Sequence, residues 1–236
     1  MTPGPRSVDR ALALLDLVAE ADGPVGAKEL ARRAGVSLST AYHLLGPLTE
    51  RGHVVRAPGG YVLGHRAPAL HRAFRRQLGG APDVAGLLLA ARRATGAEAY
   101  FSTYRGGRIA VIDSTAPVTD TTDPFTPGPE TRAHATAHGK VLLASLPRRE
   151  RARYLADHGM ARFTDRTITS AERFEAEAVR VRGGGVAVSM GEADPAYTCL
   201  AVPLPEGHAL SVALPTREFR ARHGALRAAL LGLAGA

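Results

Sequence analysis

Apolar residues recur at helical spacing between residues 27 and 52, where they predict two short helices joined by a tight turn. The buried face of the first helix is expected at Ala27, Leu30, Ala31 and Ala34. The buried face of the second is expected at Ala41, Leu44, Leu45 and Leu48. Gly35 suits the left-handed position that often follows a helix, and Ser37 is placed to cap the next one.

This pattern is typical of a helix-turn-helix, whose second helix enters the major groove of DNA. The candidate DNA-binding residues stand at the start of that helix and on its exposed side: Ser37, Leu38, Ser39, Thr40, Tyr42 and His43. The alternative is an ordinary helical hairpin with a solvated polar face. Gly46 and Pro47 predict a kink or an early end, because proline removes the hydrogen bond to the carbonyl of His43.

The flanking segments predict a winged helix. A helix capped by Ser7 is expected to run to about residue 21, with an apolar side wide enough to meet both the helix-turn-helix and a second copy of the chain. Two β-prone runs, 53–56 and 61–63, surround a Pro-Gly-Gly turn and predict a hairpin. Arg56 on this wing is placed for a phosphate or the minor groove, and a structural hairpin with a solvated Arg56 is the alternative.

A linker helix is predicted over residues 65–78. The Gly-Gly-Ala-Pro segment that follows should end this helix and mark a domain boundary. Further helices are expected at 83–95, 137–146, 148–158, 170–182 and from 217 onward. Strands are expected at 97–104, 108–114, 186–189, 198–203 and 209–213, and a long loop at 115–133. Strands followed by helices and further strands favour an α+β sheet with mostly antiparallel pairs. We therefore expect a DNA-binding domain at 1–64, a linker helix at 65–80 and a second domain at 81–236.

Composition adds an electrostatic argument. The chain has 30 basic and 22 acidic residues, and residues 1–80 carry 11 basic against 6 acidic, so the front third has most of the positive excess. Cys199 is the only cysteine, which excludes an intrachain disulfide and a multi-cysteine metal site. The sequence shows no signal-peptide pattern and no apolar run that could span a bilayer, so we expect a cytoplasmic protein without a membrane partner, metal or cofactor.

Several motifs resemble those of the IclR family of bacterial transcriptional regulators. They are RSVDRALALLD at 6–16, LSTAYHLL at 38–45, HATAHGKVLLA at 134–144, Gly191-Glu192, and CLAVP at 199–203. They occur in order, and the resemblance covers residues 6–233. It implies an N-terminal winged helix-turn-helix and a C-terminal effector-binding domain of GAF-like α/β fold. It also implies that the protein binds palindromic operators as a homodimer or a dimer of dimers, and that small organic or aromatic acids modulate this binding.

The resemblance also implies an effector pocket between the last strands and the start of the helix that follows His134. Its implied lining residues are Ala137, His138, Ser189, Glu192, Cys199 and Ser211. The free N–H groups at that helix start suit a carboxylate. His138 replaces a small or aliphatic residue of the family, Ala213 replaces a polar one found in some members, and His43 stands where arginine is frequent. The operator preference is therefore not transferable.

A thiol-dependent hydrolase joined to a DNA-binding module is the main alternative. Cys199 with His134 or His138 and Glu192 would supply the residue types, but no local catalytic signature accompanies them. Cys199 otherwise reads as a small buried hydrophobe. A DNA-binding architectural protein with an empty second domain is a further alternative. The favoured hypothesis is a non-enzymatic regulator, expected to be a repressor, whose binding to double-stranded operator DNA is modulated by a small-molecule effector.

Overall fold

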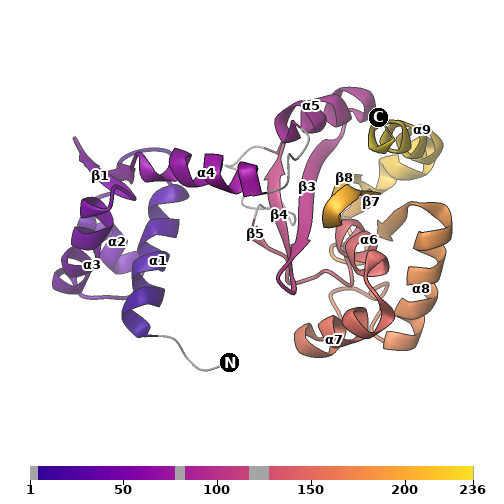
Figure 1. Cartoon of the computed structure of the whole chain (residues 1–236), viewed down its shortest axis with the longest axis horizontal. Coiled ribbons are helices and arrows are strands. Elements are labelled where there is room, and N and C mark those ends of the chain that lie inside the picture. Colours follow the sequence, from indigo (N-terminus) through magenta and orange to yellow (C-terminus); the bar gives the residue numbers. More distant parts are fainter. Residues whose placement is uncertain (1–4, 78–82, 117–127, 236) are drawn as a thin grey trace. The chain divides into compact units, whose positions relative to one another are not determined.

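The computed structural model describes residues 5–77, 83–116 and 128–235. The chain divides into two compact units, Met1–Ala81 and Pro82–Ala236 (Figure 1). The predicted end of the linker helix at residue 78 and most of the predicted loop at 115–133 lie outside the described residues. No helix among the described residues is long and apolar enough to cross a membrane.

The first unit is a helix-turn-helix followed by a hairpin. Its elements are α1 (Arg6–Ala19), α2 (Ala27–Arg33), α3 (Leu38–Glu50), β1 (Val54–Ala57), β2 (Gly60–Leu63) and α4 (Arg66–Gln77). α1 packs against α2, α3 and β2, and its Leu14 and Val18 join a buried core with Leu30, Leu45 and Tyr61. An isolated antiparallel bridge joins Val25, just before α2, to Tyr61. The apolar spacing in the sequence thus forms one small core.

The predicted Ser7 cap and the predicted early end of α3 are wrong. α1 begins at Arg6 after Pro5 and has no side-chain cap, so Ser7 lies inside the first turn. α3 continues through Pro47 to Glu50 and does not stop early. Proline removes only its own N–H, and the next turn still forms because the Arg51 N–H donates to the Pro47 carbonyl at 3.1 Å.

Over its described residues, the second unit is a six-stranded antiparallel sheet with helices on both faces. The strand order is β5-β4-β3-β8-β7-β6. The strands are β3 (Glu98–Arg105), β4 (Arg108–Ser114), β5 (Gly128–Pro129), β6 (Ala187–Met190), β7 (Tyr197–Leu204) and β8 (His208–Pro215). The helices are α5 (Val84–Thr95), α6 (Ala137–Ser145), α7 (Arg148–His158), α8 (Ala171–Gly184) and α9 (Thr216–Ala234), with a short 3-10 turn at Pro205–Gly207. The short strand β5, inside the predicted loop, was not expected.

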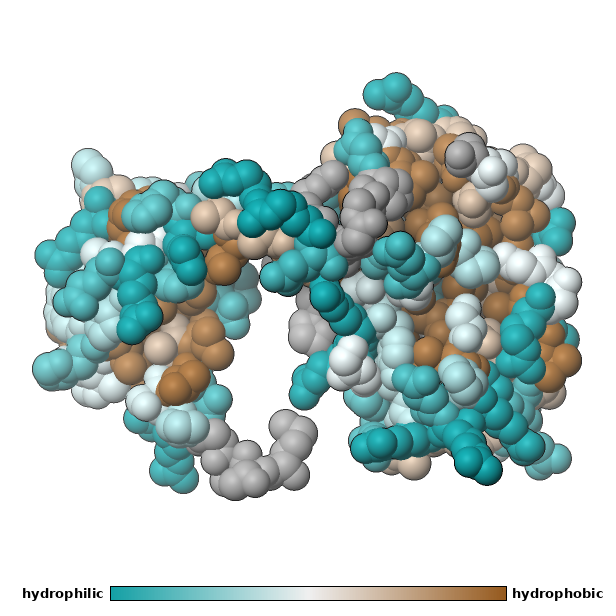
Figure 2. All heavy atoms as spheres, viewed as in Figure 1, coloured by the Kyte–Doolittle hydropathy of each residue, from teal (hydrophilic) through white to brown (hydrophobic). Residues whose placement is uncertain are grey.

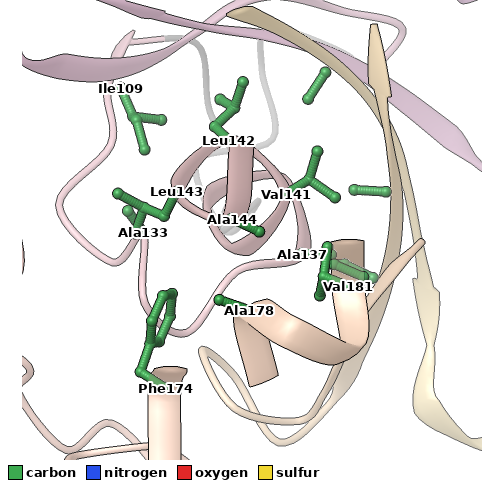
Figure 3. Close-up of a cluster of buried hydrophobic side chains, with 14 of the residues drawn as sticks. Ile109, Ala133, Ala137, Val141, Leu142, Leu143, Ala144, Phe174, Ala178 and Val181 are labelled. Atoms are coloured by element: carbon green, nitrogen blue, oxygen red, sulfur yellow. The ribbon is translucent and has the colours of Figure 1, made fainter. Parts of the chain in front are cut away.

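Alternating side chains give the sheet two apolar faces. Phe101, Leu200 and Val212 face α5 and α9, which lie together on one side. Tyr100, Cys199 and Ala213 face the opposite side, which is covered by α6 and α8. Figure 3 shows α6 inside this second cluster, with apolar side chains projecting from it in all directions. The predicted fold class, a winged helix-turn-helix followed by an α/β domain, is confirmed.

Helix α6 is the most enclosed element of the second unit, since Ala137 to Ala144 are all buried. At Gly139 the backbone of Ala133 occupies the space that a Cβ atom would need. At the other end, the buried Arg151 donates to the carbonyls of Leu143 and Leu146, at 3.3 and 2.7 Å. The same guanidinium binds both carboxylate oxygens of Glu175. α6 is therefore fixed at its start by close backbone packing and at its end by an arginine.

Candidate functional site

The exposed side of α3 carries the residues predicted to contact DNA. Ser37 caps the helix by accepting the Thr40 N–H at 3.1 Å, which confirms the predicted cap, and the two hydroxyls lie 2.8 Å apart. Leu38 and Tyr42 are 44% and 49% exposed. The remaining two candidates, Ser39 and His43, are exposed as well. The structure therefore brings the six residues together at one helix start, with Ser37 and Thr40 engaged in the cap.

Arg56 stands on the hairpin directly opposite Tyr61. Its Nε atom donates to the Tyr61 hydroxyl at 3.2 Å, and its guanidinium carbon lies 5.5 Å from the centre of the ring. Tyr61 is buried and Arg56 is exposed. The tyrosine thus orients the arginine, while the terminal guanidinium nitrogens remain able to donate to a phosphate.

A buried carboxylate lies at the start of α6. Glu130 accepts from the Arg132 N–H at 2.5 Å and from the Thr136 hydroxyl at 3.2 Å, and its Oε2 atom lies 2.6 Å from Nε2 of His138. Burial alone would raise the pKa of Glu130, but the hydrogen bond and charge of His138, with the Arg132 N–H, hold this pKa below its usual range. The predicted effector residue His138 is thus bound to a carboxylate of its own chain.

Glu192, another predicted effector residue, belongs to a buried cluster of charged side chains. The Lys140 ammonium lies 2.5 Å from Oε1 of Glu192 and 3.3 Å from Glu177, and it donates to the Val188 carbonyl at 3.1 Å. Burial raises the pKa of Glu192, with Lys140 acting in the opposite direction. The other carboxylate oxygen, Oε2, is buried and has no hydrogen-bond partner among the described residues.

The remaining predicted effector residues lie on the sheet face that packs against α6. Ser189 is paired with Cys199 across β6 and β7, and Ser211 is paired with both Ala201 and Tyr100. The Ser189 hydroxyl donates to the Ala135 carbonyl at 2.5 Å, immediately before α6. All three predicted residues are buried, as is Ala137. The structure gathers the predicted set between α6 and the sheet.

A pocket of about 210 Å³ opens near the ends of β3, β7 and β8. Its lining includes Tyr100, Ala116, Tyr197 and Ala213. Its rim includes Glu98, which is already bound by Arg92 and Thr115. None of the six predicted effector residues lines this pocket. Tyr100 pairs with Ser211 and lies on the same face of the sheet. The alternation of side chains along the strand could therefore have identified Tyr100 as a residue facing α6.

Lys140 and Glu130 were not predicted as site residues. A lysine inside the otherwise apolar stretch GKVLLA was a signal for a buried ion pair, because an unpaired ammonium is very costly to bury. Its acidic partners lie 37 and 52 residues further along the chain. Pairing over such separations is not visible in spacing or periodicity.

Comparison with known proteins gives the family. The family model for the bacterial transcriptional regulator IclR C-terminal domain matches residues 85–235, and the model for the IclR helix-turn-helix domain matches residues 7–58. The chain belongs to the IclR family. The resemblance read from the sequence motifs is thereby confirmed.

Two relatives match most of the chain. The HTH-type transcriptional regulator BhcR of Paracoccus denitrificans is 30% identical, over 85% of this chain and 72% of that protein. The transcriptional repressor IclR of Escherichia coli is 25% identical, over 86% and 76%. The crystal structure of an IclR homologue from Microbacterium hydrocarbonoxydans, complexed with 4-hydroxybenzoate, shares the fold with a TM-score of 0.70 at 18% identity, over 97% and 98%. The chain is accordingly a DNA-binding transcriptional regulator with a C-terminal ligand-binding domain.

The IclR-type structure does not support the thiol-hydrolase alternative. Nε2 of His134 lies 2.9 Å from the Ala161 carbonyl oxygen, and His138 is bound to Glu130. Glu192 is bound to Lys140. The residue types of a thiol hydrolase are therefore present, but each proposed acid or base is held by another group. Cys199 is 3% exposed and lies in the apolar cluster against α6.

Proposed function

We propose that this regulator is a cytoplasmic repressor that binds a palindromic operator through α3 and the β1–β2 hairpin. The capped α3 with its exposed N-terminal half carries the proposal, since this is the part of a recognition helix that contacts base edges. Ser37, Leu38, Ser39, Thr40, Tyr42 and His43 form the reading surface, and Arg56 contacts the phosphate backbone or the minor groove. The name of the Escherichia coli relative supports repression. The DNA-binding domain is residues 1–64, the linker helix 65–80 and the effector domain 81–236.

The effector is a small organic or aromatic acid bound in the second unit. The complex of the Microbacterium homologue with 4-hydroxybenzoate supports this ligand class. The pocket beside Tyr100 and Tyr197 measures about 210 Å³, below the usual range of about 300–1,000 Å³, which favours a small ligand. Deeper in the domain, Ala137, His138, Ser189, Glu192, Cys199 and Ser211 surround the start of α6. The free Oε2 of Glu192 would accept a hydrogen bond from a ligand hydroxyl.

The active form is a homodimer or a dimer of dimers. α1 exposes Val8 and Leu12, each 52% accessible and four residues apart on one side of the helix. Figure 2 shows apolar surface gathered over α1. A second copy of the same helix is the natural cover for this surface, and two-fold symmetry matches a palindromic site.

The test is a footprint on the DNA upstream of the chain's own coding region, titrated first with salt and then with a panel of small carboxylates and aromatic acids. We expect a protected palindrome whose affinity falls steeply with salt, because several phosphate contacts release counterions. We also expect one acid of the panel to weaken or extend the protection. Binding that is indifferent to sequence would contradict operator recognition, and an unchanged footprint with every acid would contradict the ligand class.

The protein is not an enzyme. Cys199 is buried and its proposed partners are held elsewhere, as described above. Activity toward a panel of esters and thioesters is expected to be absent in the intact protein. Turnover that disappears in Cys199→Ser would contradict this.

A further inference from the structure

We propose that α3 recognises operator thymines through their C5 methyl groups, with Leu38 and Tyr42 as the contacting side chains. The inference rests on the proposed function, because it requires that α3 enter the major groove. It adds the chemistry by which the helix reads sequence. Neither the fold nor the family assignment supplies that chemistry.

The first argument is the composition of the helix. α3 has the sequence LSTAYHLLGPLTE, which contains no Lys, Arg, Asn or Gln. Arginine and lysine make the commonest specific contacts to guanine, and asparagine and glutamine make the bidentate contacts to adenine. The side chains that read purines most strongly are therefore missing from this helix. What remains for a large contact surface is apolar, and the apolar feature of the major groove is the thymine methyl group.

The second argument is exposure. Leu38 and Tyr42 are 44% and 49% exposed, and they stand four residues apart, so they share one side of α3. Of the small hydroxyls beside them, those of Ser37 and Thr40 are bonded to each other at 2.8 Å in the helix cap, which leaves the exposed Ser39. The Leu38 side chain and the Tyr42 ring are thus the largest apolar groups on the N-terminal half of the reading surface.

The third argument is the charge around the helix. The side chains of Lys28 and Arg51 are exposed and make no hydrogen bond or ion pair with any described residue. Arg56 extends from the hairpin. These cations suit the phosphate backbone, which positions a protein on DNA without reading its sequence. Anchoring is therefore assigned to residues outside α3, and Leu38 and Tyr42 are left free for the thymine methyl contacts of the reading surface. This division of charge favours a nucleic acid as the occupant of the apolar surface over an apolar protein partner.

The experiment replaces each thymine of the footprinted operator, one at a time, with deoxyuridine, which lacks only the methyl group. At one or two positions in each half-site we expect the affinity to fall about threefold to fivefold, the effect of exposing about one buried methyl group. With Leu38→Ala or Tyr42→Ala, the loss at the position read by the altered residue should disappear. Both side chains are exposed, so the unfolding midpoints of these variants are expected to match that of the unaltered protein.

The matched control is Leu89→Ala, because Leu89 is 47% exposed on α5 in the other unit. That variant should keep the full deoxyuridine pattern. Equal affinity for every deoxyuridine operator would overturn the proposal, as would losses that persist unchanged in both α3 variants. Sensitivity confined to 7-deazaguanine substitution would assign the reading to His43 and also overturn it. A specific, salt-dependent footprint in these cases would leave the proposed function standing, whereas the absence of any footprint would contradict that function itself.

Discussion

Nε2 of His138 lies 2.6 Å from Oε2 of Glu130, and the two side chains are 1% and 5% exposed. The contact joins the first turn of α6 to the segment that precedes it. Glu130 thereby places a carboxylate at the start of a helix whose N–H groups and dipole favour negative charge. The anionic position at this helix start is therefore filled by a side chain of the chain itself.

Glu130→Gln is expected to lower the free energy of unfolding of the second unit by about 2 kcal/mol at neutral pH, because a buried hydrogen bond to a charged group is weakened. The pKa of Glu130 is lower in the folded chain than its usual value of 4.5. The ionised carboxylate therefore stabilises the fold above pH 4.5, and this contribution is lost as the pH falls through the lowered pKa. Urea unfolding across this acid range should show a flatter pH dependence in the variant. An equal pH dependence in both proteins would contradict the assignment.

The two lysines of the chain offer a matched pair of substitutions. Lys140 is 1% exposed between Glu177 and Glu192, and Lys28 is exposed on α2. Lys140→Met leaves buried carboxylates without their cation, so we expect a loss of about 3–5 kcal/mol in the free energy of unfolding. Lys28→Met should change it by less than about 0.5 kcal/mol. Chemical denaturation of both variants would measure the difference.

The loss in Lys140→Met should also depend on pH. Burial already raises the pKa of Glu192, and removing Lys140 raises it further. A carboxyl group whose pKa is raised in the folded state destabilises the fold above that pKa, and the penalty fades as the pH falls through it. The cost of the substitution should therefore be larger at pH 7.5 than at pH 5. The same cost at both values would show that the lost lysine acts through packing.

Arg56→Ala is expected to weaken operator binding without unfolding the protein, because the side chain is exposed and its anchor Tyr61 remains in the core. If Arg56 contacts one phosphate, the slope of log affinity against log salt should become shallower by about one. Fluorescence anisotropy over a salt series measures this slope. Arg105→Ala, at the exposed end of β3, serves as the control and should leave the slope unchanged.

His43→Ala should lower the affinity for the operator while the affinity for unrelated DNA stays the same, because base contacts carry the sequence information. The side chain is exposed, so its removal should not alter folding. Competition binding against both DNA molecules measures the ratio. Equal losses on the two would assign His43 to the backbone.

Replacing Val8 and Leu12 of α1 by Ser is expected to weaken self-association, since both side chains are half-exposed in the single chain. Sedimentation velocity over a concentration series should show a shift toward smaller species. Operator affinity should fall in parallel, because one chain can hold only half of a palindrome. An unchanged oligomer would show that the second copy binds through another surface.

The sequence predicted most of the helices and strands because their apolar periodicity is local. The ranges of α7 and β4 agree with the expectation to the residue, and the Ser37 cap was read from its spacing to Thr40. The errors occurred where local rules compete with packing. Pro47 does not end α3, because removing one N–H near the end of the helix leaves the final turn intact.

The predicted effector residues show which contacts could not be predicted from the sequence. The family resemblance implied Ser189, Cys199 and Ser211, and the strand pairing puts them on the face of the sheet that packs against α6. The partner of Glu192 could not be predicted, because Lys140 lies 52 residues earlier in the chain. The partner of His138, Glu130, lies only eight residues earlier, inside the predicted loop, where periodicity gives no positions. Glu130 and Lys140 decide the electrostatics of the region, and no periodic pattern marks that role.

The close packing at Gly139 has a genetic consequence. The backbone of Ala133 fills the place where any side chain would begin, and glycine is the smallest residue. Every missense change in this codon therefore adds atoms where a neighbouring backbone cannot yield. Among random mutants selected for loss of regulation, codon 139 should recur with many different replacements. Ser145 is exposed at the end of the same helix, so substitutions at codon 145 should be tolerated and should be rare in this selection.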